Sequence, residues 1–312
     1  MKRGMGSGYA KEQYRERFGQ GAPAWSGEKG GECSIYEGQM KQLGEYEVSR
    51  MTDGDYELRR GGLVVGSFKE VTVEKDRVIF PLSRDTNLEI SEKGRREVVG
   101  PEKAMLGGLI ASDGGSHLYQ RHDRRGHLRA EFKTAFDSKD FELIDLFDNL
   151  FESVYHERPH HYRGTKTITT KISHKGIFFD LNDLGIKTGP FKFHVPREHL
   201  DDVGKRAYLT GFFSGDGTLS RCRTPKGTRY EIRIYSIDRD GLAEIHQTFE
   251  DLGFHPHQIC KDNEEGEYYC FSIPSREHER FIEEIGSFKP NHRPFFDEIL
   301  EYRERLRRKR SR

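Results

Sequence analysis

Two nine-residue segments of the chain each end an apolar run with an Asp-Gly pair. They read LGGLIASDG at 106–114 and LTGFFSGDG at 209–217. If each run is a helix, its last turn carries a partial negative charge, so an aspartate there is unfavourable by itself. Asp113 and Asp216 recur at the same position, however, and two adjacent carboxylates call for a neutralising cation. Mg²⁺ commonly binds one or two carboxylates together with phosphate and water, and it activates water for phosphodiester hydrolysis.

Small residues within each segment predict a contact between the two helices. They are spaced four apart: Gly108 and Ser112 in the first segment, Gly211 and Gly215 in the second. Positions i and i+4 share a helix face, so these strips let two backbones approach closely. Gly114 and Gly217 follow the aspartates and suit the residue that ends a helix. Packed helices would therefore bring Asp113 and Asp216 side by side.

The surrounding sequence predicts an α+β unit that occurs twice. A strand-like stretch follows each segment, at 129–136 and 229–236, and each runs into a helical pattern at 138–151 and 238–254. Further stretches that we expect to be strands are 165–173, 176–186, 257–263 and 267–275. The two copies align at offsets of 99 to 100 residues after the motifs, which pairs Lys139 with Arg239. A repeat of this length predicts a duplicated domain.

Composition gives the broad class of protein. The chain has 312 residues, a formal net charge of zero, and 33% hydrophobic and 33% charged residues. It contains no apolar run long enough for a membrane span and no basic-then-apolar leader, so we expect a cytoplasmic or nucleoid-associated protein without a signal peptide. The four cysteines are scattered and predict reduced thiols. Basic residues concentrate at 117–133 and 218–239, after the two motifs, which indicates a nucleic-acid partner despite the neutral total.

The domain organisation that we expect has five parts. These are a flexible Gly- and charge-rich arm at 1–45, a small β-rich region at 46–100, two halves at 101–200 and 201–300, and a basic tail at 301–312. The arm could include one short helix, and a strand end containing Val195 and Pro196 is expected before the second motif. The histidines form no metal-ligand pattern with cysteine or carboxylate, so we expect them at the surface.

With these residues in view, the two motifs resemble the signature of the LAGLIDADG homing endonucleases. LGGLIASDG keeps the first Leu, Gly-Leu-Ile and Asp-Gly, while LTGFFSGDG keeps the first Leu, the Gly and Asp-Gly. The resemblance covers roughly residues 101–300 and does not extend to the first hundred residues. It implies a pseudo-twofold single-chain monomer of two αββαββα units, with two saddle-shaped antiparallel sheets over the DNA major groove and the motif helices at the centre.

The resemblance also implies a function and a set of site residues. It implies a site-specific endonuclease that makes double-strand breaks with Mg²⁺, or Mn²⁺ in its place, bound by Asp113 and Asp216 together with Gly114 and Gly217. The side chains expected to face double-stranded DNA are Tyr119, Arg121, Arg124, Arg125, Arg129, Lys133, Arg221, Arg223, Arg229 and Arg233. Arginine and lysine suit both phosphate anchoring and guanine recognition.

One departure from the family leaves an alternative open. A basic residue that assists the reacting water is expected at the end of the second strand of each unit, where Asp137 and Ile237 stand. Lys139 and Arg239 lie two residues further on and are the candidate accessory bases. The alternative is a catalytically weak or inactive member of the family that acts as an intron RNA maturase or a DNA-binding regulator. The chain ends lack the His-Asn pair of inteins, which favours a free-standing or intron-encoded endonuclease.

Overall fold

The structure is a computed structural model in which most of the chain beyond residue 39 is described. The described residues are 40–43, 46–52, 54–60, 63–69, 71–73, 77–83, 86–91, 94–122, 127–183, 185, 192–224, 227–262 and 267–310. The chain divides into two compact units. One contains 101–197 and 202–312, and the other contains 19–100 with 198–201. The helix predicted in the N-terminal arm lies outside the described residues.

The described part of residues 40–100 contains two antiparallel sheets. One antiparallel sheet has the strands β1 (Met40–Leu43), β2 (Tyr46–Arg50), β3 (Tyr56–Arg60) and β4 (Leu63–Phe68), in that order. The other has β5 (Thr72–Val73), β6 (Arg77–Ser83), β7 (Thr86–Ser91) and β8 (Gly94–Val99). Val48, Leu58, Val78 and Ile90 are buried in the core of this region. The prediction of a small β region is thus confirmed, although β1 lies within the stretch 1–45 that was expected to be a flexible arm.

The first half of the larger unit has the order αββαββα. Its elements are α2 (Pro101–Asp113), β9 (Gly114–His122), β10 (Leu128–Ser138), α3 (Phe141–Tyr155), β11 (His160–Arg163), β12 (Ile168–Ile172) and α4 (Lys175–Asp183). The strands form one antiparallel sheet in the order β11-β12-β10-β9. Phe136, Phe147 and Phe151 are buried between the sheet and α3, with the rings of Phe136 and Phe147 stacked at 4.9 Å.

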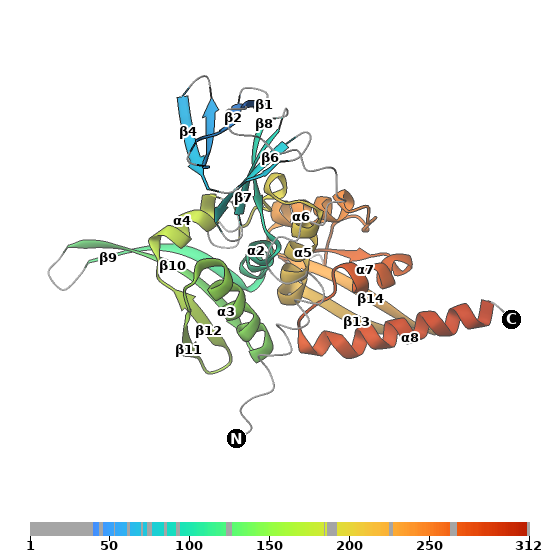
Figure 1. The fold of residues 1–312 in the computed structure, drawn as a ribbon. Coiled ribbons are helices and arrows are strands. Elements are labelled where there is room, and N and C mark those ends of the chain that lie inside the picture. Colours follow the sequence, from blue (N-terminus) through green and yellow to red (C-terminus); the bar gives the residue numbers. More distant parts are fainter. Residues whose placement is uncertain are drawn as a thin grey trace. The chain divides into compact units, whose positions relative to one another are not determined.

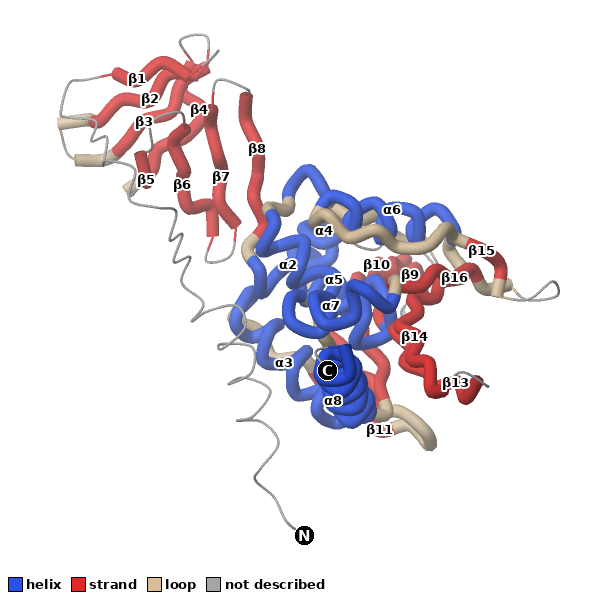
Figure 2. The backbone as a smooth tube through the Cα atoms, turned by 90° about the vertical axis from the view of Figure 1, so that its right-hand side faces the viewer, coloured by secondary structure: helices blue, strands red, loops and turns tan. Residues whose placement is uncertain are grey.

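The second half repeats this order and then adds a long helix. A 3₁₀ turn, η1 (Arg197–His199), comes before the repeat, whose elements are α5 (Asp202–Asp216), β13 (Gly217–Thr224), β14 (Gly227–Ser236), α6 (Arg239–Asp251), β15 (Cys260–Lys261), β16 (Tyr269–Ile273), η2 (Ser275–Glu277) and α7 (His278–Glu284). Next come η3 (Pro290–His292) and α8 (Arg293–Arg310). The sheet order β15-β16-β14-β13 corresponds strand for strand to the first half. The predicted duplicated α+β fold is confirmed, with α2 and α5 lying side by side between the two sheets (Figures 1 and 2).

The sequence prediction was wrong for the stretch 176–186. It was expected to be a strand, but residues up to Asp183 form α4, the closing helix of the first half. Ile177, Phe178 and Leu181 are buried, and this spacing corresponds to one face of a helix. The ring nitrogen Nδ1 of His174 accepts a hydrogen bond from the Ile177 N–H at 3.3 Å. It thus pairs one of the backbone N–H groups that have no partner within the first turn of a helix. Nor do Val195 and Pro196 lie in a strand.

The two halves align at an offset different from the one expected after the motifs. Asp140 and Asp238 are the N-cap residues of α3 and α6, and each donates its backbone N–H to a serine two residues earlier, at 3.1 and 3.0 Å. This matched geometry places Ile237, rather than Arg239, at the position of Lys139. The shift arises because the two hairpins that precede these helices differ in length.

Candidate active site and nucleic-acid interface

The small residues of α2 and α5 lie where the two backbones touch. A Cβ on Gly108 would lie 2.1 Å from the carbonyl oxygen of Tyr208, and one on Gly211 would lie 2.3 Å from that of Met105. Contacts this short cannot exist, so neither position can carry a side chain without moving a helix. The motif glycines therefore set the distance between the two helices.

The carboxyl ends of the two motif helices meet at one place. A Cβ on Gly215 would lie 2.1 Å from Ser112 Oγ and 3.2 Å from Asp113 Oδ2. The Asp113 carboxylate thus borders the residue that directly precedes Asp216. Both aspartates are partly exposed, as a site that must admit a substrate requires. The Ser112 hydroxyl donates to the Leu109 carbonyl at 2.9 Å, which keeps it within its own helix.

A matched pair of ionic contacts holds each motif helix to its own half. Lys103 near the start of α2 contacts Asp180 of α4, with Nζ and Oδ2 separated by 2.6 Å. Arg206 occupies the corresponding place in α5 and donates from Nε to Glu284 of α7 at 2.9 Å. These contacts connect the N-terminal parts of α2 and α5 to the closing helix of their own repeat.

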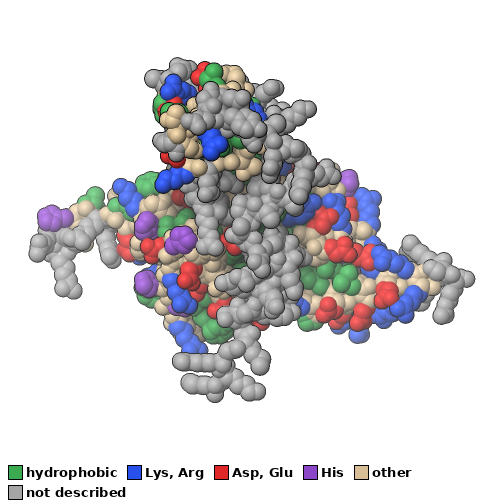
Figure 3. Space-filling view, in the orientation of Figure 1, with side chains coloured by type: hydrophobic (Ala, Val, Ile, Leu, Met, Phe, Trp, Pro, Cys, Tyr) green, Lys and Arg blue, Asp and Glu red, His purple; other side chains and the backbone are tan. Residues whose placement is uncertain are grey.

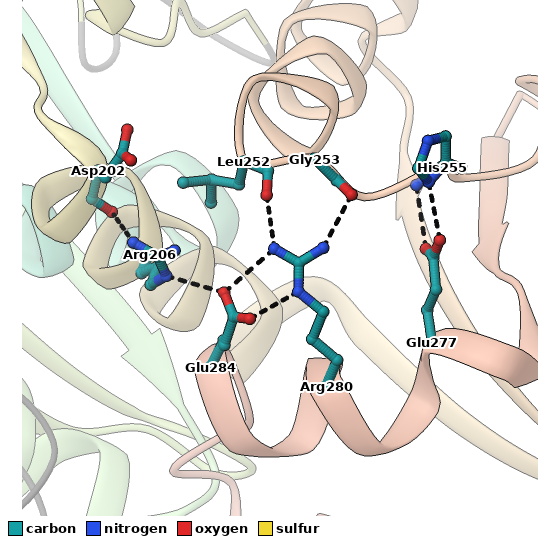
Figure 4. A network of polar contacts seen from close by, with 8 residues as sticks. All are labelled: Asp202, Arg206, Leu252, Gly253, His255, Glu277, Arg280 and Glu284. Carbon is teal, nitrogen blue, oxygen red and sulfur yellow. Dashed lines mark hydrogen bonds and ion pairs between the residues drawn. The ribbon is translucent and has the colours of Figure 1, made fainter.

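The second of these contacts belongs to a larger network. Arg280 donates to the Leu252 and Gly253 carbonyls at 2.6 and 2.8 Å, and its Nε donates to Glu284 at 2.6 Å (Figure 4). Burial alone would raise the pKa of Glu284, but hydrogen bonds and charges from Arg280 and Arg206 outweigh it and hold the pKa below its usual range. The network therefore ties the end of α6 to α5 and α7.

Lys289 is the basic side chain that the structure places at the end of the second motif. Its Nζ donates to the Gly215 carbonyl at 2.9 Å, next to Asp216 in the chain. Sequence reasoning missed it, because Lys289 follows α7 and lies far from the motif along the chain. Lys139 and Arg239, the bases proposed from the sequence, are exposed residues at the starts of α3 and α6.

The donor set at the motif ends fits a divalent cation that also binds substrate. The described residues contain no group of three or more His, Cys, Asp or Glu side chains able to hold an ion alone. A magnesium ion needs only one or two carboxylates from the protein when phosphate and water complete its shell. Asp113 and Asp216 would provide these carboxylates. Gly114 and Gly217, the other predicted ligands, are the first residues of β9 and β13.

In the first half, the predicted DNA-facing residues of the described strands share one face of the sheet. The register places Tyr119 opposite Glu131 and Arg121 opposite Arg129. Lys133 lies on the same face and its ammonium sits 4.9 Å from the centre of the Tyr119 ring. The opposite face is covered by α3 and α4. Arg124 and Arg125 lie outside the described residues.

In the second half, the four predicted arginines divide between the two faces of the sheet. Arg221 is opposite Tyr230 in the register, and both donate to Glu298 of α8 at 3.1 Å. Arg223 shares the face of Arg221 by alternation. Arg229 and Arg233 lie on the other face, with Arg233 2.7 Å from Glu231. The reason is the register, in which odd-numbered residues of β13 lie opposite even-numbered residues of β14. An odd-numbered arginine of β13 and an odd-numbered arginine of β14 therefore lie on opposite faces of the sheet.

The helix α8 carries mixed charge along its exposed surface (Figure 3). Its acidic and basic side chains pair within the helix, as in Arg305–Glu301 and Arg308–Glu304. Arg307 instead contacts Glu279 of α7 at 2.6 Å. The predicted basic tail is therefore, up to Arg310, the end of a helix packed on the second half.

Comparisons with known proteins agree with this architecture. Residues 204–286 match the family model described as a LAGLIDADG-like domain. The second half of the chain is thus similar to LAGLIDADG-like domains, as the resemblance of the motifs predicts. No curated protein sequence matches the chain significantly.

The solved structures to which the chain is similar include a homing endonuclease and a meganuclease. Mesophilic variants of I-DmoI share 19% identity over 60% of this chain and 95% of theirs, with a TM-score of 0.45. A complex of I-DmoI with DNA and Mn gives the same identity and TM-score over 96% of that chain. The meganuclease I-SmaMI bound to uncleavable DNA shares 13% identity over 69% of this chain and 92% of its own, with a TM-score of 0.48. Among the described residues, no helix is long and apolar enough to cross a membrane.

Proposed function

We propose that this protein is a site-specific DNA endonuclease that hydrolyses both strands of a long target with Mg²⁺, or Mn²⁺, bound by Asp113 and Asp216. The observation that carries the proposal is the juxtaposition of the two motif ends, in which Asp113 Oδ2 would lie 3.2 Å from a Cβ on Gly215. Two carboxylates at negatively polarised helix ends repel each other. A bound cation that also binds phosphate would offset this repulsion.

The residues at this centre would divide the chemistry between them. A bound divalent ion would lower the pKa of a water molecule and offset the charge that develops on the phosphate. Asp113 and Asp216 would hold the ions. Lys289 lies beside the second motif and would stabilise negative charge at the scissile phosphate. Lys139, Gly114, Gly217 and Arg239 remain candidates for supporting roles.

The outer faces of the two sheets would bind the duplex. Tyr119, Arg121, Arg129 and Lys133 of the first sheet and Arg229 and Arg233 of the second share these faces. Lys133 and Arg233 currently pair with Glu131 and Glu231, at 3.1 and 2.7 Å. Phosphates would compete with these acids, so binding should weaken steeply as salt increases. We propose that the protein acts as a monomer, because one chain supplies both motifs.

The test is an in vitro selection in which the protein cleaves a random library of DNA duplexes in Mg²⁺. We expect a single long target to be recovered and cut on both strands. Asp113→Asn and Asp216→Asn should each reduce cleavage by more than about 100-fold while leaving DNA binding in Ca²⁺ intact. Cleavage by both variants at the parent rate would refute the proposal.

A second candidate function has one observation in its favour. Ile237 stands where the first half has Lys139, so one unit lacks a basic residue at that position. A family member that binds without cutting, as an intron RNA maturase or a DNA-binding regulator, could tolerate this loss. Recovery of bound but uncut DNA, or faster splicing of an intron RNA, would support this function over cleavage.

A further inference from the structure

The segment after α7 is anchored to the second motif helix through buried hydrogen bonds. Ser214 is fully buried in α5, where its hydroxyl donates to the Thr210 carbonyl at 2.7 Å. The same oxygen accepts the Phe288 N–H at 2.9 Å. The residue next to Lys289 is therefore fixed to the motif helix, two residues before Asp216.

A second set of bonds fixes the backbone of Lys289 itself. Its backbone N–H donates to Ser287 Oγ at 3.1 Å, and that hydroxyl lies 2.9 Å from His292 Nδ1. His292 is only 4% exposed and its ring lies against Phe213, with 5.3 Å between centroids. Its hydrogen bond to the Gly217 backbone closes the chain of contacts at the residue after Asp216.

The hydroxyl of Ser287 lies at the centre of these contacts. Its oxygen accepts the Lys289 N–H and lies 2.9 Å from His292 Nδ1 and 3.4 Å from Ser214 Oγ. Ser287 therefore connects the anchor on α5 to both Lys289 and His292.

The first half lacks the hydroxyl that anchors this segment. The residue that corresponds to Ser214 in the first motif is Ala111, whose side chain cannot accept a hydrogen bond. If these hydrogen bonds served only the stability of the duplicated fold, we would expect them in both halves. They occur instead at the motif that lies beside Lys289, which indicates that they help to place its ammonium group.

We infer that Ser214, Ser287 and His292 are positioning residues that hold the Lys289 ammonium at the end of the second motif. A free lysine side chain loses conformational entropy when it is ordered. Fixing the backbone N–H groups of Phe288 and Lys289 reduces how far the ammonium group can move before the substrate arrives. The inference rests on the proposed function for its catalytic consequence, but the position of Lys289 can be measured without it.

The variants that test it remove single hydrogen bonds and keep the packing. Ser287→Ala removes the acceptor for the Lys289 N–H, and His292→Phe keeps a ring among the neighbouring aromatic side chains. His292→Asn retains an acceptor for Ser287. Thr248→Ala is the matched control, because Thr248 is buried and donates to the Glu244 carbonyl at 2.7 Å, within α6.

Four quantities are measured on each variant. These are the melting temperature, the single-turnover cleavage rate, the DNA affinity in Ca²⁺, and the ¹³C-methyl NMR signal of reductively methylated Lys289. The signal is assigned with Lys289→Arg. We expect Ser287→Ala and His292→Phe to slow cleavage about 10- to 100-fold at unchanged affinity. Their Lys289 signal should move to the position of exposed lysines, with partial recovery in His292→Asn. The control should lower only the melting temperature.

The inference is overturned if the Lys289 signal and the cleavage rate of Ser287→Ala and His292→Phe match those of Thr248→Ala. In that case the network serves only the stability of the fold. If the parent protein does not cleave DNA at all, the proposed function fails, and the NMR signal alone then decides whether the network positions Lys289.

Discussion

Replacing Gly108 with alanine tests whether the motif glycines set the position of the two carboxylates. The new Cβ would lie 2.1 Å from the Tyr208 carbonyl oxygen and 2.8 Å from the Phe212 nitrogen. Both are backbone atoms of a buried helix, so neither can move aside as a flexible side chain would. The helices must separate by about 1 Å at this point, which disturbs their close packing.

The magnitude follows from two opposing effects. Overpacking a buried contact costs about 1–3 kcal/mol, and a clash with backbone lies at the upper end. Removing glycine from a helix interior returns about 1 kcal/mol. We expect a net loss of about 2 kcal/mol, which lowers the melting temperature of a unit of this size by about 4–8 °C. A displacement of about 1 Å between the carboxylates should slow cleavage about 100-fold.

The assay is differential scanning calorimetry, which can separate the transition of the larger unit from that of the N-terminal unit. Gly176→Ala is the matched control, because a Cβ there would meet only the His174 ring, at 3.2 Å. We expect the control to melt at the parent temperature or slightly above it. A Gly108→Ala protein that melts with the parent, or a control that loses as much, would show that helix contact does not limit this position.

Three further predictions concern the same unit. Tyr208→Phe should raise the free energy of unfolding by about 1 kcal/mol in urea denaturation, because the buried hydroxyl has no hydrogen-bond partner among the described residues; a lower stability would contradict this. Arg280→Met should destabilise the unit by about 1–3 kcal/mol at neutral pH, since it removes charge-assisted bonds to Glu284 and two carbonyls. The pKa of Glu284 is lowered in the folded protein, so its stabilisation is present above the unfolded pKa and is lost as the pH falls through the folded pKa; the difference between parent and variant should therefore shrink on acidification. Cys260 and Cys270 are opposite in the register with their sulfurs 3.8 Å apart, so a mild thiol oxidant should join them, measured as the loss of two free thiols; both thiols remaining titratable would count against this.

The motif geometry could be predicted from local sequence. Gly108 and Gly211 lie on a helix face at the spacing that close packing requires, and the structure has backbone contacts at both. The strands β10 and β14 were recognised from alternation, because a strand buried on one face must alternate. A helix face and a strand face are properties of neighbouring residues, so they can be predicted without knowledge of the fold. The stretch that became α4 was misread because its Ile-Phe-Phe run suits either element until its burial is known.

Other features depended on tertiary structure. Whether Arg221 shares a face with Arg229 is decided by hairpin register, and a shift of one residue reverses the face. The position of Lys289 beside Gly215 depends on how α7 packs against α5, since the two residues are far apart in sequence. Ser214 and His292 could be recognised as partners only once that segment was placed. The sequence by itself determined that two carboxylates end two matched helices. Only the tertiary structure decided which basic group lies beside the second motif, because long-range packing, unlike helix and strand periodicity, has no repeating pattern along the chain.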